Sequence, residues 1–213
     1  EYVPRGIPVK AIWLGAFFLV LAWSAIQPRD YPTWALEVAP AIVGLIIMVF
    51  TYNRFRLTPM LYWLILAHCI VLMVGGHYTY AEVPLFDYLK PLFGWERNNY
   101  DKLGHFMQGF VPAILAREIL IRRAVVASAP WRNLFIVSLC LAFSAFYELI
   151  EWWVAVLTGT ASEAFLGTQG YIWDTQSDML WALLGAIAAL VILSGVHDRQ
   201  LANLRGSDAG HDN

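Results

Sequence analysis

The sequence predicts an all-α, polytopic membrane protein with six transmembrane helices. Three observations support this prediction: 59% of the 213 residues are hydrophobic, only 14% are charged, and the mean hydropathy is +0.56. A soluble domain of this length needs more charge to cover its surface. The apolar residues run continuously instead of alternating, which indicates helices rather than the strands of a barrel.

Six stretches reach or approach the roughly 20 residues that a helix needs to cross the hydrocarbon core. We expect these helices near residues 8–27, 34–52, 58–78, 102–122, 132–158 and 175–196. They form a single transmembrane helical domain within residues 1–213, and residues 197–213 are expected to form a polar tail. No small-residue cleavage site follows the first stretch, so we interpret it as a retained helix and not as a signal peptide.

The connections between these helices differ in composition. Pro59 suits the first turn of the third helix. The connection 82–100 mixes aromatic and charged residues, which predicts a short helix or a re-entrant segment in the membrane interface. The connection 159–173 has glycines and no Lys or Arg, so its tight turns could help the 82–100 connection to cap a buried site.

The distribution of basic residues predicts the orientation. With the N-terminus inside, the inner segments hold ten Lys and Arg residues and the outer segments hold four. Because short cytoplasmic loops are enriched in Lys and Arg, both termini are expected in the cytoplasm. The net charge of −2 indicates no nucleic-acid partner, and membrane lipids are the expected contacts. Cys69 and Cys140 lie mid-helix, where packing in the interior is the expected role.

Ionisable residues inside these apolar helices are the main indication of function. Charges within a bilayer are costly, and each needs a partner, a cavity or an ion. Three pairs lie at the spacing of one helical face: Asp101 with His105, Glu148 with Glu151, and Asp174 with Asp178. Gln108 continues the first stripe, Ser144 precedes the second, and His77 ends the third helix.

The expected topology places all these residues in the outer half of the bilayer, so a shared pocket near the outer face is predicted. Carboxyl groups in such a pocket either retain protons or bind a divalent cation, and His with Asp or Glu suits zinc, iron or manganese. The candidate metal ligands are His77, Asp101, His105, Glu148 and Asp174. The candidate catalytic residues are Glu148, Glu151 and Asp178.

Each candidate also has a structural interpretation. Asp101 and Asp174 stand where helix N-caps are expected. Glu151 precedes two tryptophans and could reach the interface, whereas Glu148 lies deeper. His105 and His77 could be structural histidines, and His68 is expected to hydrogen-bond a neighbouring helix.

The same segments resemble the YjdF-type inner-membrane family. They are GGHYTY at 75–80, YDKLGHF at 100–106, QGFVP at 108–112, YELIEW at 147–152, GTQG at 167–170, WDTQ at 173–176 and DM at 178–179. The resemblance implies a multi-pass protein of the bacterial inner (cytoplasmic) membrane and supplies no reaction. More distantly, the DKxxHF run, the later Glu and the final Asp resemble VanZ-like membrane proteins. Family members are expected to have an acidic residue where this chain has Tyr171, which puts one part of the site in doubt.

Three functions fit the sequence. The first is a metal-assisted enzyme that acts on a lipid or a lipid-linked envelope substrate. The second is a non-catalytic accessory subunit of a larger membrane complex, with other membrane subunits as partners. The third is a small carboxylate-based transporter, which is the weakest because the charges gather at one face of the membrane.

Overall fold

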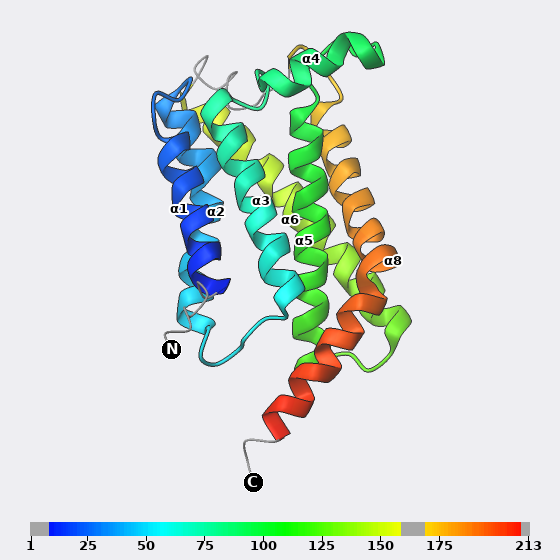
Figure 1. The fold of residues 1–213 in the computed structure, drawn as a ribbon. Helices are drawn as coiled ribbons and strands as arrows, with labels where there is room; N and C mark the ends of the chain where they lie inside the picture. Colours follow the sequence, from blue (N-terminus) through cyan, green and yellow to red (C-terminus); the bar gives the residue numbers. More distant parts are fainter. Residues whose placement is uncertain (1–8, 159–168, 210–213) are drawn as a thin grey trace, which may run out of the picture.

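The structure is a computed structural model that describes residues 9–158 and 169–209, and within these ranges its regular structure is entirely helical (Figure 1). The helices are α1 (Val9–Ser24), α2 (Tyr31–Thr51), α3 (Pro59–Tyr78), α4 (Pro84–Phe93), α5 (Tyr100–Arg122), α6 (Ala129–Thr158) and α8 (Asp174–Ala209). The six long helices begin within one turn of the positions expected from the sequence. The additional short helix, α4, confirms the helix predicted in the 82–100 connection.

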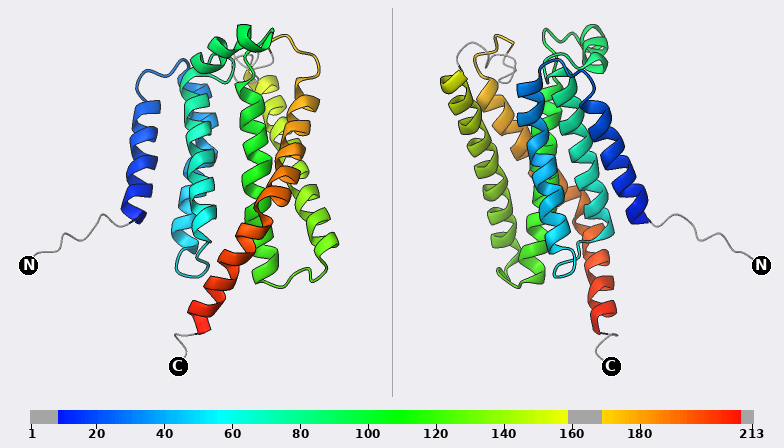
Figure 2. Two further views of the ribbon diagram at one scale, coloured as in Figure 1. Left: turned by 45° about the vertical axis from the view of Figure 1, so that its right-hand side comes forward. Right: turned by 90° about the vertical axis from the view of Figure 1, so that its left-hand side faces the viewer.

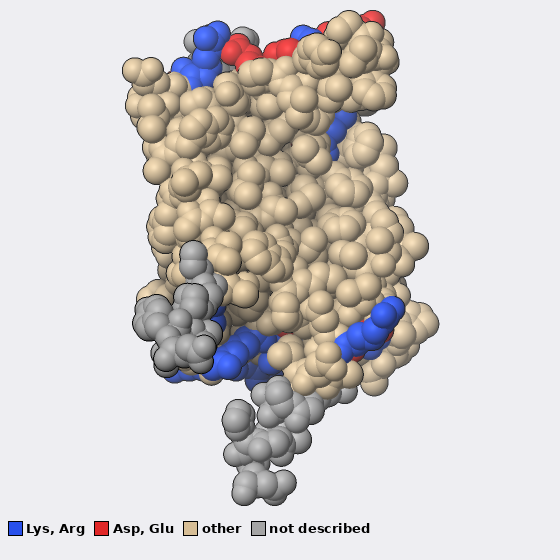
Figure 3. Space-filling view, in the orientation of Figure 1, with Lys and Arg blue, Asp and Glu red and all other residues tan. Residues whose placement is uncertain are grey.

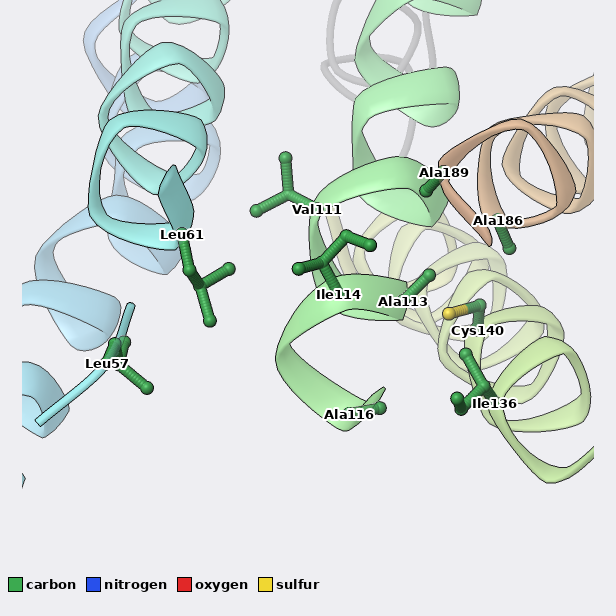
Figure 4. Close-up of a cluster of buried hydrophobic side chains, with 10 residues drawn as sticks. All are labelled: Leu57, Leu61, Val111, Ala113, Ile114, Ala116, Ile136, Cys140, Ala186 and Ala189. Carbon is green, nitrogen blue, oxygen red and sulfur yellow. The ribbon is translucent and has the colours of Figure 1, made fainter. Parts of the chain in front are cut away.

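The long helices form two groups that share α3. Helices α1 and α2 pack against α3, and α5 joins α3 to α6 and α8 (Figures 1 and 2). One apolar cluster holds α1, α2 and α3 together. A second cluster lies between α3, α5, α6 and α8 and includes Leu61, Ile114, Cys140 and Ala186 (Figure 4). Helix α4 lies across the end of the bundle where α5 begins (Figure 1).

The surface of the bundle is that of a protein in contact with lipid. A broad band with little charge separates the two ends; Lys and Arg side chains lie along the end opposite α4, and both basic and acidic side chains lie at the end that carries α4 (Figure 3). Helices α2, α3, α6 and α8 are long and apolar enough to cross a membrane, whereas α1 is apolar but has only 16 residues. Large apolar side chains such as Phe50, Leu157 and Val191 are more than three-quarters exposed. This composition is that of a polytopic membrane protein.

The expectation that helix α8 ends near residue 196 is wrong, because the helix continues to Ala209. Residues 210–213 of the expected polar tail lie outside the described residues. The chain stays helical because His197, the first residue of that tail, is fully buried against α5. Its Nε2 lies 3.1 Å from Glu118 Oε2, and its Nδ1 lies 3.0 Å from Arg117 Nη1. Since Arg donates only, Nδ1 accepts and Nε2 donates to the Glu118 carboxylate.

Glu118 is the centre of this network and is also fully buried. It accepts hydrogen bonds from the backbone N–H and the hydroxyl of Thr58, at 3.1 and 2.8 Å, and from Arg122 at 2.9 Å. Asp198 accepts from Arg117 at 2.8 Å. A buried charge with this many partners is structural, so the network joins the start of α3, the end of α5 and the middle of α8.

Helices α5 and α8 cross at two glycines. A Cβ atom added to Gly109 would lie 1.8 Å from the carbonyl oxygen of Ala182, and one added to Gly185 would lie 2.1 Å from that of Phe106. Only glycine permits two backbones to approach so closely. The two glycines lie about two and a half to three turns from the start of their helices, so the crossing fixes how the first turns of α5 and α8 face each other.

We predict that Gly185→Ala destabilises the protein. The methyl group meets the backbone of α5, which cannot rotate away as a side chain can, so we expect a loss of about 2–3 kcal/mol. Gly195→Ala in the same helix is the matched control, because nothing lies within 4 Å of its added Cβ. Thermal unfolding of both variants in detergent measures the difference. Equal unfolding temperatures would show that the close crossing is absent.

Candidate metal centre

The structure brings the three predicted pairs of ionisable residues together at one end of the bundle. Asp101 and His105 come from the first two turns of α5, Asp174 and Asp178 from the first two turns of α8, and Glu148 and Glu151 from the C-terminal half of α6. All six are buried. Spacing along each helix placed them on common faces, and the close crossing of α5 and α8 places two of those faces opposite each other.

The first group consists of His105, Glu148 and Asp178, one residue from each of three helices. Their ligand atoms lie within 4.8 Å of one another. His105 Nε2 is 3.6 Å from Asp178 Oδ2, and His105 Nδ1 is 3.9 Å from Glu148 Oε1. Among the described residues, Glu148 Oε1 and Asp178 Oδ1 have no hydrogen-bond partner although both are buried. Such oxygens are available to a cation.

Gln108 fixes the orientation of His105 from one turn further along α5. Its Oε1 accepts a hydrogen bond from His105 Nδ1 at 2.9 Å. The lone pair of the imidazole therefore lies on Nε2, which faces Asp178. A histidine that binds a metal commonly donates its second N–H in this way. The Glu148 carboxyl also hydrogen-bonds Thr175 of α8.

The second group consists of Asp101, Asp174 and Asp178, and it shares Asp178 with the first. Arg97, just before α5, lies among these acids and donates from Nη1 to Asp174 and from Nη2 to Asp101. Its burial lowers the pKa of the guanidinium, but the hydrogen bond to Asp174 and the charge of Asp101 raise it by more. Arg97 is therefore a permanent cation within the acidic cluster.

A pair of reciprocal hydrogen bonds holds the segment that carries Arg97. Asn98 N–H donates to Gln169 Oε1 at 3.0 Å, and Gln169 Nε2 donates to the Asn98 carbonyl oxygen at 2.8 Å. The Asn98 side chain donates to the Val83 carbonyl oxygen at 3.0 Å. Gln169 has a φ of 48°, a left-handed conformation that is unfavourable for a residue with a side chain. The connection before α5 and the connection before α8 thus meet beside the acidic cluster; residues 159–168 lie outside the described residues.

A cavity of about 110 Å³ adjoins the cluster. Its lining includes four of the six paired residues, His105, Asp178, Asp101 and Glu151. The other lining residues include Glu37, His68, Tyr80 and Tyr147. A cavity of this size accommodates several water molecules.

Glu37 is the residue that sequence reasoning missed most clearly. It lies on α2, is buried, and accepts a hydrogen bond from the Tyr147 hydroxyl at 3.3 Å; Tyr80 also hydrogen-bonds this carboxyl. The sequence feature that could have identified it is an acidic residue inside an apolar helix, one turn before Pro40. Because α2 carries no second acid or histidine at helical spacing from Glu37, a search for paired ionisable residues does not select it.

His77 is not brought to the cluster. Its ring lies 4.5 Å from the Trp23 ring, centroid to centroid, and its Nδ1 lies 3.1 Å from the Ser24 carbonyl oxygen. It therefore faces the end of α1, and its expected place in a shared ligand set is corrected. The histidine of α3 that lines the cavity is His68, in the middle of that helix.

The simpler structural interpretations of the acids differ from what the structure shows. Asp101 lies inside α5, whose N-cap is Asn99, and Asp101 pairs with Arg97. Asp174 also pairs with Arg97. Glu151 does not reach the interface: it is 8% exposed, whereas the adjacent Trp152 is 58% exposed.

Tyr171, where an acid was expected, stands outside the first group. Its ring lies 5.5 Å from the Arg97 guanidinium carbon and 5.7 Å from Lys102 Nζ, and the residue is 40% exposed. Tyr171 lines a second pocket, together with Asp174 and Thr175, and not the cavity beside His105. The tyrosine at position 171 therefore leaves the three candidate ligands His105, Glu148 and Asp178 in place.

The fold and the cluster define a class: a polytopic helical membrane protein with a buried His and carboxylate pocket at one end of its bundle. The chain belongs to the family described as "Predicted membrane protein (DUF2238)", whose match covers residues 9–199. It is 49% identical to "Inner membrane protein YjdF" of Escherichia coli (strain K12) over 183 residues, which are 86% of this chain and 88% of that protein. No solved structure matches it significantly.

These similarities confirm the YjdF-type resemblance, but they do not support the VanZ-like part of it. The family, the inner-membrane relative and the apolar helices identify the chain as a multi-pass protein of the bacterial inner membrane.

We predict that Gln169→Ala loosens the connection that carries Arg97. The Asn98 amide loses its acceptor, which is worth about 1–1.5 kcal/mol, so its hydrogen exchange should accelerate by about tenfold. Gln176→Ala is the control, because Gln176 is an exposed glutamine of α8. Exchange is followed by mass spectrometry on the protein in detergent. An unchanged rate at Asn98 would contradict the described pairing.

Proposed function

We propose that this protein is a metal-assisted hydrolase that acts on a lipid or a lipid-linked envelope substrate. One observation carries the proposal. Two buried carboxylate oxygens, Glu148 Oε1 and Asp178 Oδ1, have no hydrogen-bond partner in the described structure; their residues form a triad with His105, and His105 and Asp178 line a cavity.

A divalent cation explains these oxygens better than packing does. A buried polar atom without a partner costs about 1–3 kcal/mol, and a buried carboxylate without compensation costs more. Three ligands, one imidazole and two carboxylates, with further positions open to the cavity, are typical of a catalytic rather than a structural metal site. This donor set suits zinc, iron or manganese.

The ion's role would be to polarise the bond that breaks and to activate water. Glu151 lines the same cavity as His105 and Asp178 and is the proposed general base. It takes a proton from the attacking water, whose oxygen bonds to the carbonyl carbon or the phosphorus. The bond to the leaving oxygen breaks, and Glu151 returns the proton to that oxygen. One ester and one water thus give one acid and one alcohol.

The position of the cavity supports a substrate from the membrane. It lies at the end of the bundle covered by α4, whose Leu85, Tyr88, Leu92 and Phe93 are more than 60% exposed. Aromatic and apolar side chains on a helix of this kind are typical of the depth of lipid headgroups. An ester or phosphate group of a lipid reaches the same depth.

The transporter hypothesis is disfavoured by the packing below the cavity. The residues that separate the outer acids from the buried network at Glu118 form an apolar cluster with Val111, Ile114, Ala186 and Ala189 (Figure 4). Within the described residues, these side chains provide no polar group to carry an ion between the two ends. No comparable observation favours the accessory-subunit hypothesis, which the experiment below can distinguish.

We further propose that all six long helices span the membrane, with α4 on the outer side and both termini in the cytoplasm. The inner connections carry most of the Lys and Arg residues, which supports this orientation. Helix α5 is more polar than the other proposed spans. Its acidic and basic residues can lie within the membrane because α6 and α8 pack against α5. Helix α1 packs beside α3, and at 1.5 Å per residue its 16 residues cover about 24 Å.

This topology predicts the labelling of single cysteines by a membrane-impermeant maleimide in whole cells. Glu96→Cys, on the outer connection after α4, should react at once. Arg54→Cys, on the connection between α2 and α3, should react only after the inner membrane is permeabilised. The native Cys69 and Cys140 are buried and provide the unlabelled background. The reverse pattern would overturn the orientation.

The proposed function predicts one bound divalent ion per chain and a turnover that depends on it. His105→Ala should weaken zinc or manganese binding at least tenfold, because it removes a ligand, whereas His77→Ala should leave binding unchanged. Glu151→Gln should keep the ion and lower turnover about a hundredfold, the usual contribution of a general base. Binding is measured by elemental analysis and calorimetry of the purified protein.

Turnover is measured in vesicles of total bacterial envelope lipids with ¹⁸O-labelled water, by following label in the products. Stoichiometric metal that His105→Ala removes, with label in a lipid-derived acid, is the expected result. A protein that binds no ion and releases no labelled product, but copurifies with other membrane subunits, would favour the accessory-subunit hypothesis instead.

A further inference from the structure

The acidic cluster has the arrangement of a site for two cations, although one of the two positions contains a side chain. His105, Glu148 and Asp178 form one triad, Asp101, Asp174 and Asp178 form the other, and each has its ligand atoms within 4.8 Å. A carboxylate shared by two triads is the usual bridge between paired metal ions, which lie about 3.5–4 Å apart. Asp178 is 3% exposed, and its Oδ1 has no hydrogen-bond partner among the described residues.

Arg97 fills the second triad. Its two terminal nitrogens donate to Asp174 and to Asp101, so the guanidinium lies between carboxylates that come from different helices. These are the same oxygens that a cation in this triad would need. A guanidinium and a metal ion cannot share them, because carboxylate oxygens bind zinc at about 2.0–2.2 Å and exclude other donors there.

The surroundings hold the guanidinium in this position. Its side chain is only 12% exposed. The two hydrogen bonds between Asn98 and Gln169 join the connection before α5 to the connection before α8. The Tyr171 ring lies 5.5 Å from the guanidinium carbon of Arg97. Hydrogen bonds, two acids and an aromatic ring hold this residue in place, so we interpret it as a component of the site and not as a surface side chain.

We propose that Arg97 takes the place of a second divalent cation: the protein binds one ion at His105, Glu148 and Asp178, and removal of the Arg97 side chain opens a second site at Asp101, Asp174 and Asp178. The first half of this statement rests on the proposed function. The second half does not, because it concerns oxygens that Arg97 now occupies. Arg97 is thus a positioning residue that sets the number of ions in the site.

The charges explain why a cation is needed at the second triad. Three acids within 4.8 Å repel one another when ionised, so they must retain protons or enclose positive charge. Arg97 supplies that charge in the wild-type protein. When it is replaced by an uncharged side chain of similar length, the acids are left with protons or with a metal ion, and added zinc or manganese competes for them.

The test compares the ion content of the wild-type protein and of R97M, both purified in detergent and titrated with zinc alone or manganese alone. The wild-type protein should bind one ion per chain and R97M two. With manganese, electron paramagnetic resonance should show an isolated ion in the wild-type protein and a spin-coupled pair in R97M. R97K is the matched control: it keeps the positive charge and should still bind one ion.

Two further variants identify the sites. R97M combined with D174N should return to one ion, because the second site loses a ligand. R97M combined with H105A should also bind one ion, with no spin coupling, because only the second site remains. If R97M does not fold, D101N in the otherwise wild-type chain provides the test: Asp101 is occupied by Arg97, so D101N should still bind one ion, and loss of that ion would overturn the proposal.

The outcomes separate this proposal from the proposed function. One ion in the wild-type protein and one in R97M would overturn the role of Arg97 and leave the hydrolase hypothesis intact. No ion in the wild-type protein but one in R97M would support the role of Arg97 and overturn the first site. No ion in either protein would overturn both.

Discussion

The close crossing of α5 and α8 is the constraint on which the acidic site depends. Gly109 and Gly185 let each backbone touch the other, and any side chain at these positions would meet a carbonyl oxygen. The crossing directs the first turns of both helices toward each other, so Asp101 and His105 face Asp174 and Asp178. Glu148 then completes the cluster from α6. A small-residue contact in the membrane thus determines the geometry of the polar site beyond it.

The bundle places its buried charges at its two ends and compensates them differently. At the end opposite α4, Glu118 is surrounded by donors, so the network is complete and serves to hold α3, α5 and α8 together. At the end beside α4, Arg97 compensates two acids, while Glu148 and Asp178 each keep an oxygen without a partner among the described residues, and Asp178 borders a cavity. The contrast between the two ends is the physical reason to assign function to the end beside α4.

Helical periodicity predicted the long helices and the three acidic stripes, because both depend on local sequence. It could not predict which stripes meet, and it failed where tertiary contacts decide. His77 has the right depth but faces Trp23 on α1, whereas Arg97 belongs to a connection and enters the cluster from outside the helices. Glu37 has no second acid or histidine at helical spacing. The polar tail at His197 is helical because α5 supplies partners that hydropathy does not reveal.

The most direct test of the account is the position of a bound metal ion. Crystals of the protein grown with manganese and measured at its absorption edge should give one anomalous peak per chain. The account predicts this peak within bonding distance of His105 Nε2, Glu148 and Asp178, with Arg97 still between Asp101 and Asp174. A peak between Asp101 and Asp174, a peak at His77, or no peak at saturating manganese would contradict it.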